Sequence, residues 1–402
     1  MTTTPCQPVR VGALVERIET WNPASCDNER IFTYIDIASV NSNLKEIVGS
    51  RTLKCSDAPS RARQLLRAGD VLVSTVRPNL NAVAHVPRQL DGATASTGFC
   101  VLRANRTRLS DRYLFHWVRT NDFVNAMVRQ ATGASYPAVS DRIICESVIP
   151  LPHPDNPKKS LAEQTRIATI LDKADEICRK KHGTIKNLAD LQQSLFLYYF
   201  GDPSTNSKGW PIGTIRELVA ETQYGTSAKA GLAGRYPVLR MNNITAEGEW
   251  NFDDLKYMDL DSSVTQKYLV RAGDILFNRT NSPELVGKTA VYRSSKLMAF
   301  AGYLVRVRAN ERALPDYIAG YLNSSHGKAV LARTCKHIIG MANINAQEMQ
   351  NIRIALPPMK LQTIYMEALA CVRQKREKQV TFTVAAESMF AGLVQRAFQG
   401  EL

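Results

Sequence analysis

A long internal repeat constrains this chain more than any other feature of its sequence. The run LRAGDVLV at residues 66–73 returns as VRAGDILF at residues 270–277, an offset of 204 residues. Further along, GFCVLRAN at 98–105 corresponds to GYLVRVRAN at 302–310, with one residue inserted. Self-similarity over such a distance indicates two copies of one structural plan.

Two further matches extend the repeat toward both ends of each copy. We match Val11-Gly12 with Ile212-Gly213, and Pro150-Leu151-Pro152 before Gln164 with Leu356-Pro357-Pro358 before Gln362. A chain of 402 residues is long enough for two or three domains. We therefore expect one domain over 1–157 and a second over 202–359, followed by helical arms over 158–201 and 360–402.

Each copy carries the signals of a mixed α/β (α+β) domain. Short runs rich in Val, Ile, Phe and Tyr, bounded by turn residues, are typical of strands. Apolar residues spaced by three and four are typical of helices. These patterns predict strands over 34–40, 70–76, 99–102, 274–277 and 303–307, and helices over 111–130 and 315–333.

The two arms have the pattern of long amphipathic helices. Residues 161–200 contain no proline and carry apolar side chains at helical spacing, and residues 361–398 repeat the pattern. We expect Ser160 to cap the first arm with Glu163, and Gly201 to end it. Neither helix can bury its stripe alone, so the simplest arrangement is an antiparallel, coiled-coil-like pair that acts as a spacer of roughly 60 Å. The alternative is that each arm folds back onto its own domain.

The charge and the cysteines narrow the class of protein. A net charge of +14, with the excess shared by both copies, favours a polyanionic partner such as nucleic acid. The eight cysteines form no CxxC pair and no zinc-ligand spacing, so we expect reduced thiols and no metal. The chain shows neither a secretory leader pattern nor eighteen consecutive apolar residues, which predicts a cytoplasmic protein without a membrane span.

Two similar basic domains on a spacer suit the recognition of two short DNA segments separated by untouched base pairs. Arginine and lysine suit guanine, whereas asparagine and glutamine suit adenine. The alternative is that these polar residues only form turns and solvated surface. The candidate DNA-binding residues are Arg77, Asn79, Asn81, Ser135 and Tyr136 in the first copy, and Arg279, Asn281, Lys288, Lys336, His337, Asn343 and Asn345 in the second.

The sequence contains no convincing catalytic motif. The run at 282–289 resembles a phosphate-binding loop, but Ser282 replaces its first glycine and Pro283 follows. Asp254-Leu255-Lys256 has nuclease-like spacing without a supporting acidic residue, and Leu356-Pro357-Pro358-Met359 lacks the residues that hold a flipped base. We therefore predict a protein that is not an enzyme.

Three segments together resemble the specificity subunit of type I restriction-modification systems. They are LRAGDVLVSTVRPNLN at 66–81, GDILFNRTNSPELVGKTAVY at 273–292, and the proline-rich run that leads to Glu163-Gln164. The resemblance implies two target-recognition domains alternating with two helices, each domain reading one half of a split, asymmetric DNA site. The second copy departs from the first at one place, because Leu361 occupies the position before Gln362 where the first copy has Glu163 before Gln164.

The resemblance also implies partners and a cofactor held elsewhere. Two methyltransferase subunits would bind S-adenosylmethionine and methylate adenine, restriction subunits can join, and this chain itself would bind double-stranded DNA and no cofactor. Docking of the methyltransferase would use the arms and nearby aromatic residues, which are Phe196, Tyr198, Tyr199 and Phe200 unless these are intramolecular core. The alternatives are a duplicated protein-docking scaffold in a DNA defence complex, and a nuclease with an acidic cluster that the sequence does not reveal.

Overall fold

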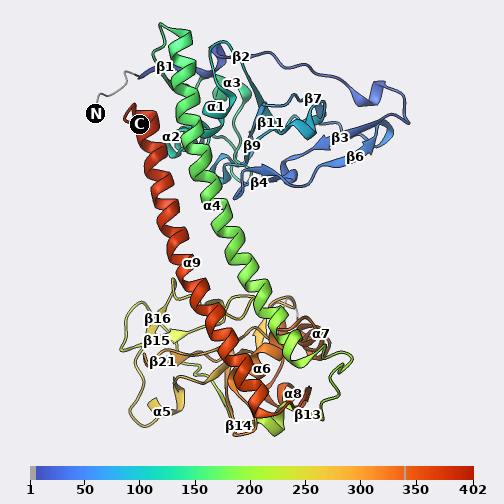
Figure 1. The fold of residues 1–402 in the computed structure, drawn as a ribbon, viewed down its shortest axis with the longest axis vertical. Coiled ribbons are helices and arrows are strands. Elements are labelled where there is room, and N and C mark those ends of the chain that lie inside the picture. The colour runs from blue at the N-terminus through green and yellow to red at the C-terminus, as the bar shows by residue number, and fades with distance from the viewer. Residues whose placement is uncertain (1–5, 339–340) are drawn as a thin grey trace. The chain divides into compact units, whose positions relative to one another are not determined.

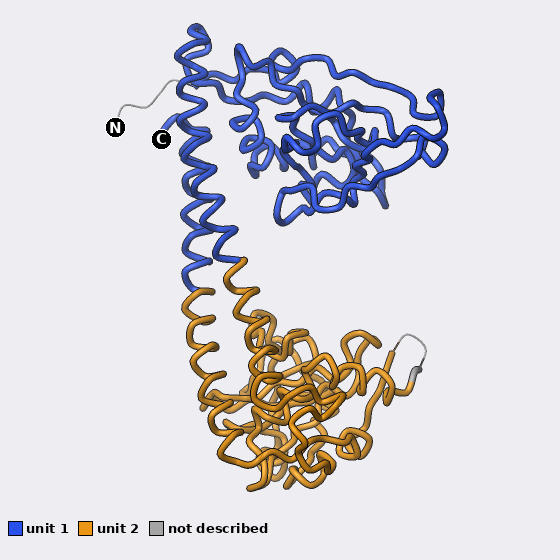
Figure 2. The backbone as a smooth tube through the Cα atoms, turned by 45° about the vertical axis from the view of Figure 1, so that its right-hand side comes forward, with its two compact units in different colours: residues 1–182, 381–402 blue, residues 183–380 orange. Residues whose placement is uncertain are grey.

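The computed structural model describes residues 6–338 and 341–402, except for the side chains of His337 and Ile338. The chain divides into two compact units (Figure 2). Unit 1 comprises the chain up to His182 together with Thr381–Leu402, and unit 2 comprises Gly183–Val380. Two long helices, α4 (Pro157–Phe200) and α9 (Met359–Gln399), each contribute one part to either unit.

Unit 1 contains two four-stranded sheets, with strand orders β2-β11-β8-β9 and β6-β3-β10-β7, and two strand pairs, β1-β12 and β4-β5 (Figure 1). Short helices α1 (Asp111–Trp117), α2 (Asn121–Gln130) and α3 (Asp141–Glu146) pack with the first sheet and with parts of α4 and α9. The strands are β1 (Cys6–Arg10), β2 (Val15–Glu16), β3 (Ile31–Ile35), β4 (Val40–Asn41), β5 (Glu46–Ile47), β6 (Arg51–Lys54), β7 (Ala62–Leu65), β8 (Val71–Ser74), β9 (Val83–His85), β10 (Thr94–Ser96), β11 (Phe99–Ala104) and β12 (Val148–Pro152).

Unit 2 repeats this plan with sheets β14-β22-β18-β20 and β16-β15-β21-β17 and the pair β13-β25, and it adds a small sheet, β19-β24-β23. Its helices are α5 (Thr265–Tyr268), α6 (Pro315–Asn323), α7 (Ser325–Thr334) and α8 (Ala346–Gln350). Its strands are β13 (Ile212–Thr214), β14 (Val219–Tyr224), β15 (Tyr236–Leu239), β16 (Lys256–Met258), β17 (Leu269–Val270), β18 (Ile275–Asn278), β19 (Thr280–Asn281), β20 (Thr289–Val291), β21 (Met298–Phe300), β22 (Leu304–Ala309), β23 (Lys336–Ile338), β24 (Met341–Asn343) and β25 (Arg353–Ala355).

The repeated RAGD motif forms the same turn in both units, and its aspartate is buried in each. Gly69 and Gly273 have φ angles of 93° and 95°, a backbone conformation that favours glycine. Asp70 then accepts a hydrogen bond from the Arg67 amide and pairs with the Arg103 guanidinium at 2.8 Å. Asp274 is buried in the same way and pairs with Arg308 of β22, also at 2.8 Å. The repeat, and with it the predicted mixed α/β fold, is confirmed.

The match of Val11-Gly12 with Ile212-Gly213 was wrong. The Val11 amide donates to the Ser147 carbonyl at 2.9 Å, and the amide that does the equivalent is Ile215, which donates to the Ile352 carbonyl at 3.0 Å. Val11 and Ile215 are both fully buried. Val11 therefore corresponds to Ile215, at the same offset of 204 residues as the RAGD motif, and the Val-Gly match arose from chance similarity of short apolar segments.

Each of the helices predicted over 111–130 and 315–333 is interrupted. In unit 1, α1 ends at Trp117, and the Thr120 hydroxyl then accepts the Phe123 amide at 3.2 Å and so starts α2. In unit 2, Ser324 does the same for the Gly327 amide at 3.0 Å. Serine and threonine are good N-caps, and the apolar spacing continues across the break, so periodicity alone does not reveal it.

The predicted strand over 34–40 is also interrupted. β3 ends at Ile35, and a turn at Ile37–Ser39 precedes β4. Asp36 caps this turn, because its carboxylate accepts the Ser39 amide at 3.0 Å. The polar Asp-x-x-Ser pattern outweighs the β propensity of the surrounding residues.

The predicted cap at Ser160 was wrong as well. The helix α4 begins at Pro157, where proline costs no backbone hydrogen bond, and Asn156 accepts the Lys159 amide at 3.1 Å. Ser160 is buried inside the helix and accepts a hydrogen bond from Gln164 at 3.0 Å. The predicted end is confirmed, because α4 stops at Phe200 and Gly201 has a φ of 80°.

The two long helices pair in antiparallel fashion inside each unit. In unit 1, His182 of α4 lies 3.2 Å from Glu387 of α9. In unit 2, Phe196 and Phe200 of α4 make edge contacts with Tyr365 of α9. Each helix therefore buries its stripe partly against the other helix and partly against the domains. The predicted antiparallel pairing is confirmed, and α4 and α9 are continuous helices that do not fold back onto their own domains.

Two equivalent glutamines fasten the long helices to the domains. In unit 1, the buried Gln164 accepts a hydrogen bond from the Ser110 amide at 2.8 Å and donates to the Arg108 carbonyl at 3.0 Å. In unit 2, Gln362 accepts from the Leu314 amide at 2.8 Å and donates to the Arg312 carbonyl at 3.2 Å. Each buried amide side chain thus satisfies backbone groups of a loop and joins the start of the helix to the domain.

Within the described part of the chain, no helix has both the length and the hydropathy needed to cross a bilayer.

Candidate nucleic-acid interface

The two candidate DNA-binding loops of unit 1 lie against each other. The Arg77 amide donates to the Pro137 carbonyl at 2.7 Å, and the Val139 amide donates to the Thr75 carbonyl at 2.9 Å. Val76 and Ala138 form an isolated antiparallel bridge between these contacts. Loop 74–81, which follows β8, and loop 131–140, which follows α2, therefore form one polar surface.

Arg77 and Tyr136 form the exposed centre of this surface. The guanidinium carbon of Arg77 lies 4.7 Å from the centre of the Tyr136 ring. Tyr136 is 68% exposed, and Asn79 and Ser135 beside the pair are also exposed. A guanidinium that rests on a ring keeps its N–H donors free at its edge, which suits a base or a phosphate. These four predicted residues lie together on the surface.

The conformation of loop 74–81 is unusual. Arg77 and Asn81 have φ angles of 50° and 45°, on either side of a turn of 3-10 helix at Pro78–Leu80. Such angles are uncommon for residues other than glycine and persist only where surrounding contacts hold them. Asn81 is only partly exposed, and its carbonyl accepts a hydrogen bond from Lys45 at 2.6 Å. Asn81 therefore holds the end of the loop against the rest of unit 1.

In unit 2, the hydrogen-bond register shows which residues are equivalent. The Ile344 amide donates to the Arg279 carbonyl at 2.9 Å, as the Val139 amide does to Thr75 in unit 1. Arg279 therefore corresponds to Thr75, and Asn281 corresponds to Arg77. The two units present different side chains from the same backbone position.

Several of the candidates in unit 2 bind the protein itself. Arg279 is partly buried, stacks over Tyr224 and donates to Asn343, whose amide in turn donates to Thr280 at 2.8 Å. Asn345 caps α8 by accepting the Gln347 and Glu348 amides, both at 2.9 Å. The asparagine side chains at positions 343 and 345 therefore have a role in folding the loop. This is the alternative considered from the sequence, in which the polar residues form turns.

The remaining candidates in unit 2 differ in exposure. Lys288 donates to the Met241 carbonyl at 2.9 Å, and burial lowers the pKa of its ammonium group. Asn281 is partly exposed and accepts the Ser282 amide at 2.9 Å. Lys336 is exposed and lies 2.7 Å from Glu348, whereas the side chain of His337 lies outside the described residues. Asn281 and Lys336 remain available for a ligand.

The aromatic candidates for docking divide in the same way. Phe196 and Phe200 are 2% and 4% exposed, and both contact Tyr317 and Tyr365 in the core of unit 2. Tyr199 is partly buried against Tyr365. Phe196 and Phe200 are therefore intramolecular core residues, and only Tyr198, at 73% exposure, presents a whole ring to solvent.

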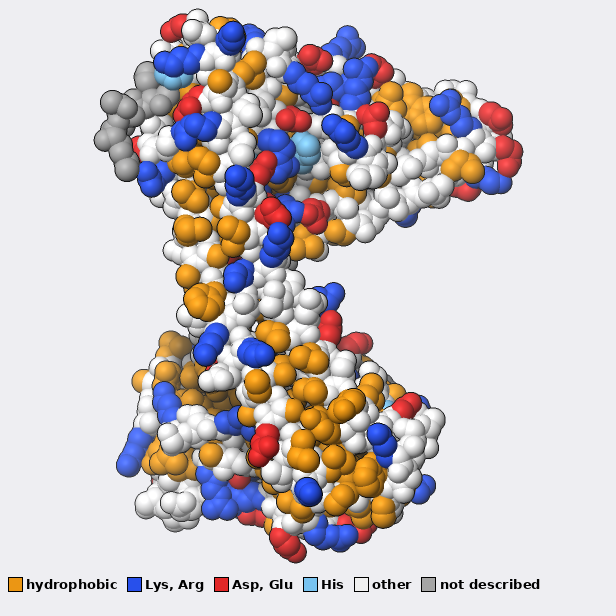
Figure 3. All heavy atoms as spheres, in the orientation of Figure 1, with side chains coloured by type: hydrophobic (Ala, Val, Ile, Leu, Met, Phe, Trp, Pro, Cys, Tyr) orange, Lys and Arg blue, Asp and Glu red, His pale blue; other side chains and the backbone are white. Residues whose placement is uncertain are grey.

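Charge is mixed on the face that Figure 3 shows, where Lys and Arg side chains alternate with Asp and Glu on both units. The positive excess therefore does not gather there in a single patch.

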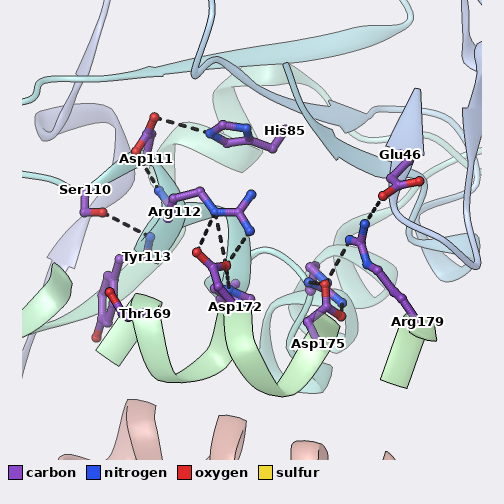
Figure 4. A network of polar contacts seen from close by, with 12 residues as sticks. Glu46, His85, Ser110, Asp111, Arg112, Tyr113, Thr169, Asp172, Asp175 and Arg179 are labelled. Carbon is purple, nitrogen blue, oxygen red and sulfur yellow. Dashed lines mark hydrogen bonds and ion pairs between the residues drawn. The ribbon is translucent and has the colours of Figure 1, made fainter. Parts of the chain in front are cut away.

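An ion-pair network that the sequence did not reveal fastens α4 to the domain of unit 1 (Figure 4). Arg112 donates through Nε to both carboxylate oxygens of Asp172, at 3.1 and 3.0 Å, and the buried His116 contacts Asp172 at 2.7 Å. One turn further along α4, Asp175 binds Arg119 at 2.7 Å and Arg179 at 2.8 Å. Acidic residues on the helix thus bind basic residues of the domain.

Asp172 should make the stability of unit 1 sensitive to acid. Burial opposes ionisation, but hydrogen bonds from His116 and Arg112 outweigh it and lower the pKa of Asp172 to about 2. This pKa lies below the unfolded value of about 3.9, so the contacts stabilise the fold above that pH, and the stabilisation is lost as the pH falls toward about 2. We expect Asp172→Asn to lower stability at neutral pH and to flatten its dependence on pH in this range, as measured by urea unfolding. A slope equal to that of the unaltered protein would contradict the assignment.

Among the described residues, no group of three or more His, Cys, Asp or Glu side chains is arranged to hold a metal ion.

Comparison with known proteins gives relatives of one kind. No protein-family model matches the chain. The chain is 26% identical over 196 residues to the EcoKI specificity subunit of Escherichia coli K12, a match that spans 47% of this chain and 42% of that subunit. It is 23% identical over 323 residues to the StySPI specificity subunit of Salmonella potsdam, spanning 76% of this chain and 68% of that one. Less than half of the first relative's length is thus matched.

Solved structures give the same result for the fold. A chain from a type I restriction-modification complex is 24% identical and covers both chains completely, with a TM-score of 0.60. The specificity subunit of the type I system of M. genitalium is 12% identical, covers 99% of both chains and has a TM-score of 0.57. In sequence and in fold, this chain is therefore a relative of the specificity subunits of type I restriction enzymes, as its repeated motifs predicted.

Proposed function

We propose that this chain is the non-catalytic DNA-specificity subunit of a type I restriction-modification complex. The observation that carries the proposal is the duplication of one domain plan with different side chains at equivalent loop positions, Arg77 in unit 1 and Asn281 in unit 2. Domains that share a scaffold and differ in their loops suit a split, asymmetric site. We place the two recognition domains at 1–157 and 202–359.

In unit 1, the Arg77–Tyr136 pair is the best candidate for a base contact. The Arg77 guanidinium lies 4.7 Å from the centre of the Tyr136 ring, and a planar fork of donors matches O6 and N7 of guanine. In unit 2, Asn281 occupies the matching position, and an asparagine amide matches adenine. The two domains would then read different base pairs.

The partners follow from the proposed family role. Two methyltransferase subunits, which would carry S-adenosylmethionine, would bind this chain in the cytoplasm on double-stranded DNA, and restriction subunits can join them. Leu197 and Tyr198 of α4 are 50% and 73% exposed, which makes them candidates for contact with the methyltransferase. The helices α4 and α9 would set the number of base pairs between the two half-sites.

Sequencing of adenine methylation tests the proposal. DNA is exposed to this chain together with the methyltransferase subunit encoded beside it, and each protein is omitted in turn. A split, asymmetric motif methylated only when both are present is the expected result. Methylation by this chain alone, or by the methyltransferase without it at the same motif, would refute the assignment.

Replacing Arg77 by alanine should weaken binding to the cognate site by about 1–3 kcal/mol, because a bidentate contact to guanine is lost. Competition binding with DNA altered in either half-site measures the effect, which should relax selectivity in one half only. The matched control is Arg142→Ala, since Arg142 is a well exposed arginine of unit 1 that pairs with Glu146 on α3. Equal weakening on every DNA sequence would assign Arg77 to a phosphate instead.

A further inference from the structure

The hairpin formed by β4 and β5 in unit 1 lies between the DNA-binding loop and the long helix α4. On one side, Lys45 of the hairpin turn donates to the Asn81 carbonyl at 2.6 Å. On the other side, Glu46 pairs with Arg179 of α4 (Figure 4). Adjacent residues of one hairpin therefore hold the end of loop 74–81 and the helix at the same time.

A second route joins the same two places. The side-chain amide of Asn81 donates a hydrogen bond to the Arg119 carbonyl at 3.4 Å. The Arg119 guanidinium in turn binds Asp175 of α4 at 2.7 and 3.2 Å. Asp175 also binds Arg179 at 2.8 Å, which closes a ring of contacts. Asn81 is held from both sides, which accounts for its left-handed backbone conformation.

The Arg119–Asp175 pair of this ring is shielded from water, whereas the Arg179 and Glu46 side chains are 32% and 48% exposed. Asp175 is 7% exposed, and the Arg119 side chain packs over the Phe115 and Phe390 rings. Ion pairs that are shielded from water interact more strongly than exposed ones. A cavity of about 370 Å³ lies beside the ring and is lined in part by Lys45, Glu46 and Arg179, so these side chains can be exchanged without disturbing a packed core.

Unit 2 also connects its DNA-binding loop to a long helix through a short segment, but here the lysine belongs to the loop and not to the segment. Here Lys288, which belongs to the loop, donates to the Met241 carbonyl at 2.9 Å in the segment that leads into the Ile244–Trp250 bridge. Glu249 of that segment lies 3.7 Å from Arg376 of α9 and accepts a hydrogen bond from Gln192 of α4 at 3.1 Å. Residues 241–250, which the Ile244–Trp250 antiparallel bridge closes, are called the unit 2 hairpin below. In both units, a lysine joins the DNA-binding loop to the hairpin and a glutamate joins the hairpin to a long helix.

We infer that these two hairpins orient the DNA-binding loops relative to the long helices, with Lys45, Glu46 and Arg179 as positioning residues in unit 1 and Lys288, Glu249 and Arg376 in unit 2. The inference rests on the proposed function, because its consequence is that each hairpin controls selectivity for one half-site. The recurrence of the arrangement in both units, despite different residues in the loops, is what supports it.

Exchange of the ion pair tests the inference in unit 1. Glu46→Arg places two positive charges together, whereas Arg179→Glu places a carboxylate against both Glu46 and Asp175. The double variant restores an opposite pair at the hairpin with its sign reversed, but it does not restore the contact between position 179 and Asp175. Hydrogen exchange of the full-length chain should show faster exchange of the Leu80 and Asn81 amides in each single variant and a return toward the original rate in the double variant. Exchange that is unchanged in both single variants would overturn the inference, whether or not the chain binds DNA.

Half-site selectivity in the complex with the methyltransferase provides the functional measurement. Each single variant should lose about tenfold of its preference for the half-site read by unit 1, and the double variant should recover the part of this loss that Glu46→Arg alone causes. Selectivity for the other half-site should not change, and Glu249→Arg should give the opposite distribution. Equal loss at both half-sites would indicate general destabilisation and would overturn the inference. If the unaltered complex shows no split site while loop exchange still responds, the proposed function fails and the structural coupling stands.

Discussion

Replacing Asp70 by alanine is expected to lower the free energy of unfolding of unit 1 by about 3–5 kcal/mol, because it leaves a buried arginine without its counter-charge. The Asp70 and Arg103 side chains are 2% and 9% exposed, and they join the turn before β8 to β11 through two hydrogen bonds, at 2.9 and 2.8 Å. Asp70 also accepts the Arg67 amide, so the substitution removes the turn's internal contact as well. Urea unfolding followed by hydrogen exchange of peptides from unit 1 measures the change.

Two variants make this measurement specific. Glu29→Ala removes an ion pair with Lys54 whose side chains are 74% and 50% exposed, and it should cost less than about 1 kcal/mol. Asp274→Ala removes the equivalent buried carboxylate in unit 2 and should destabilise unit 2 rather than unit 1. Similar losses for Asp70→Ala and Glu29→Ala would show that the repeated motif has no special part in stability.

Exchanging residues 211–357 for the corresponding segment of a different specificity subunit is expected to replace one half of the methylated motif completely. The segment begins immediately before β13 and ends just after β25, and these strands pair with each other. The Leu356 amide donates to the Pro211 carbonyl at 2.8 Å, so both junctions lie side by side at the base of the domain. An exchange there leaves the glutamine contact between Gln362 and its loop partners to be re-formed by equivalent residues of the incoming domain.

Methylation sequencing of the chimeric complex reads the outcome. The half-site read by unit 1 and the number of base pairs between the half-sites should stay as they were, because unit 1 and both long helices are unaltered. The matched exchange of residues 1–157 should replace the other half. A motif in which both halves change after a single exchange would show that the units do not read DNA independently.

The sequence by itself determined the repeat and the long helices, because their signals are local. The RAGD turn needs glycine at a positive φ and an aspartate three residues from the amide that it accepts, and both requirements are visible in four consecutive residues. The apolar spacing of the arms and the glycine that ends α4 are equally local. The exposure of Arg77 and Tyr136 on neighbouring loops also agrees with the sequence-based proposal.

Features that depend on short competing signals were harder to predict. The caps at Thr120 and Ser324 interrupt helices whose apolar pattern continues, and Pro157 with Asn156 starts α4 earlier than the serine that follows. In each case one side-chain hydrogen bond sets where a helix begins, whereas the apolar spacing is the same on both sides of that position.

Only the tertiary structure decided which polar and aromatic residues are available to a partner. Lys288 and Asn345 are residue types that are common in DNA-binding loops. Lys288, however, donates to a carbonyl 47 residues away, and Asn345 accepts a backbone amide of the helix that it caps. Glu46 and Arg179 are 133 residues apart, and no local sequence pattern around either residue predicts that they form an ion pair. Phe196 and Phe200 lie on a helical stripe whose partner, Tyr365, comes from the other long helix. Local hydrogen bonds and periodicity are encoded in neighbouring residues, whereas burial and ion pairing depend on which distant segments the fold brings together.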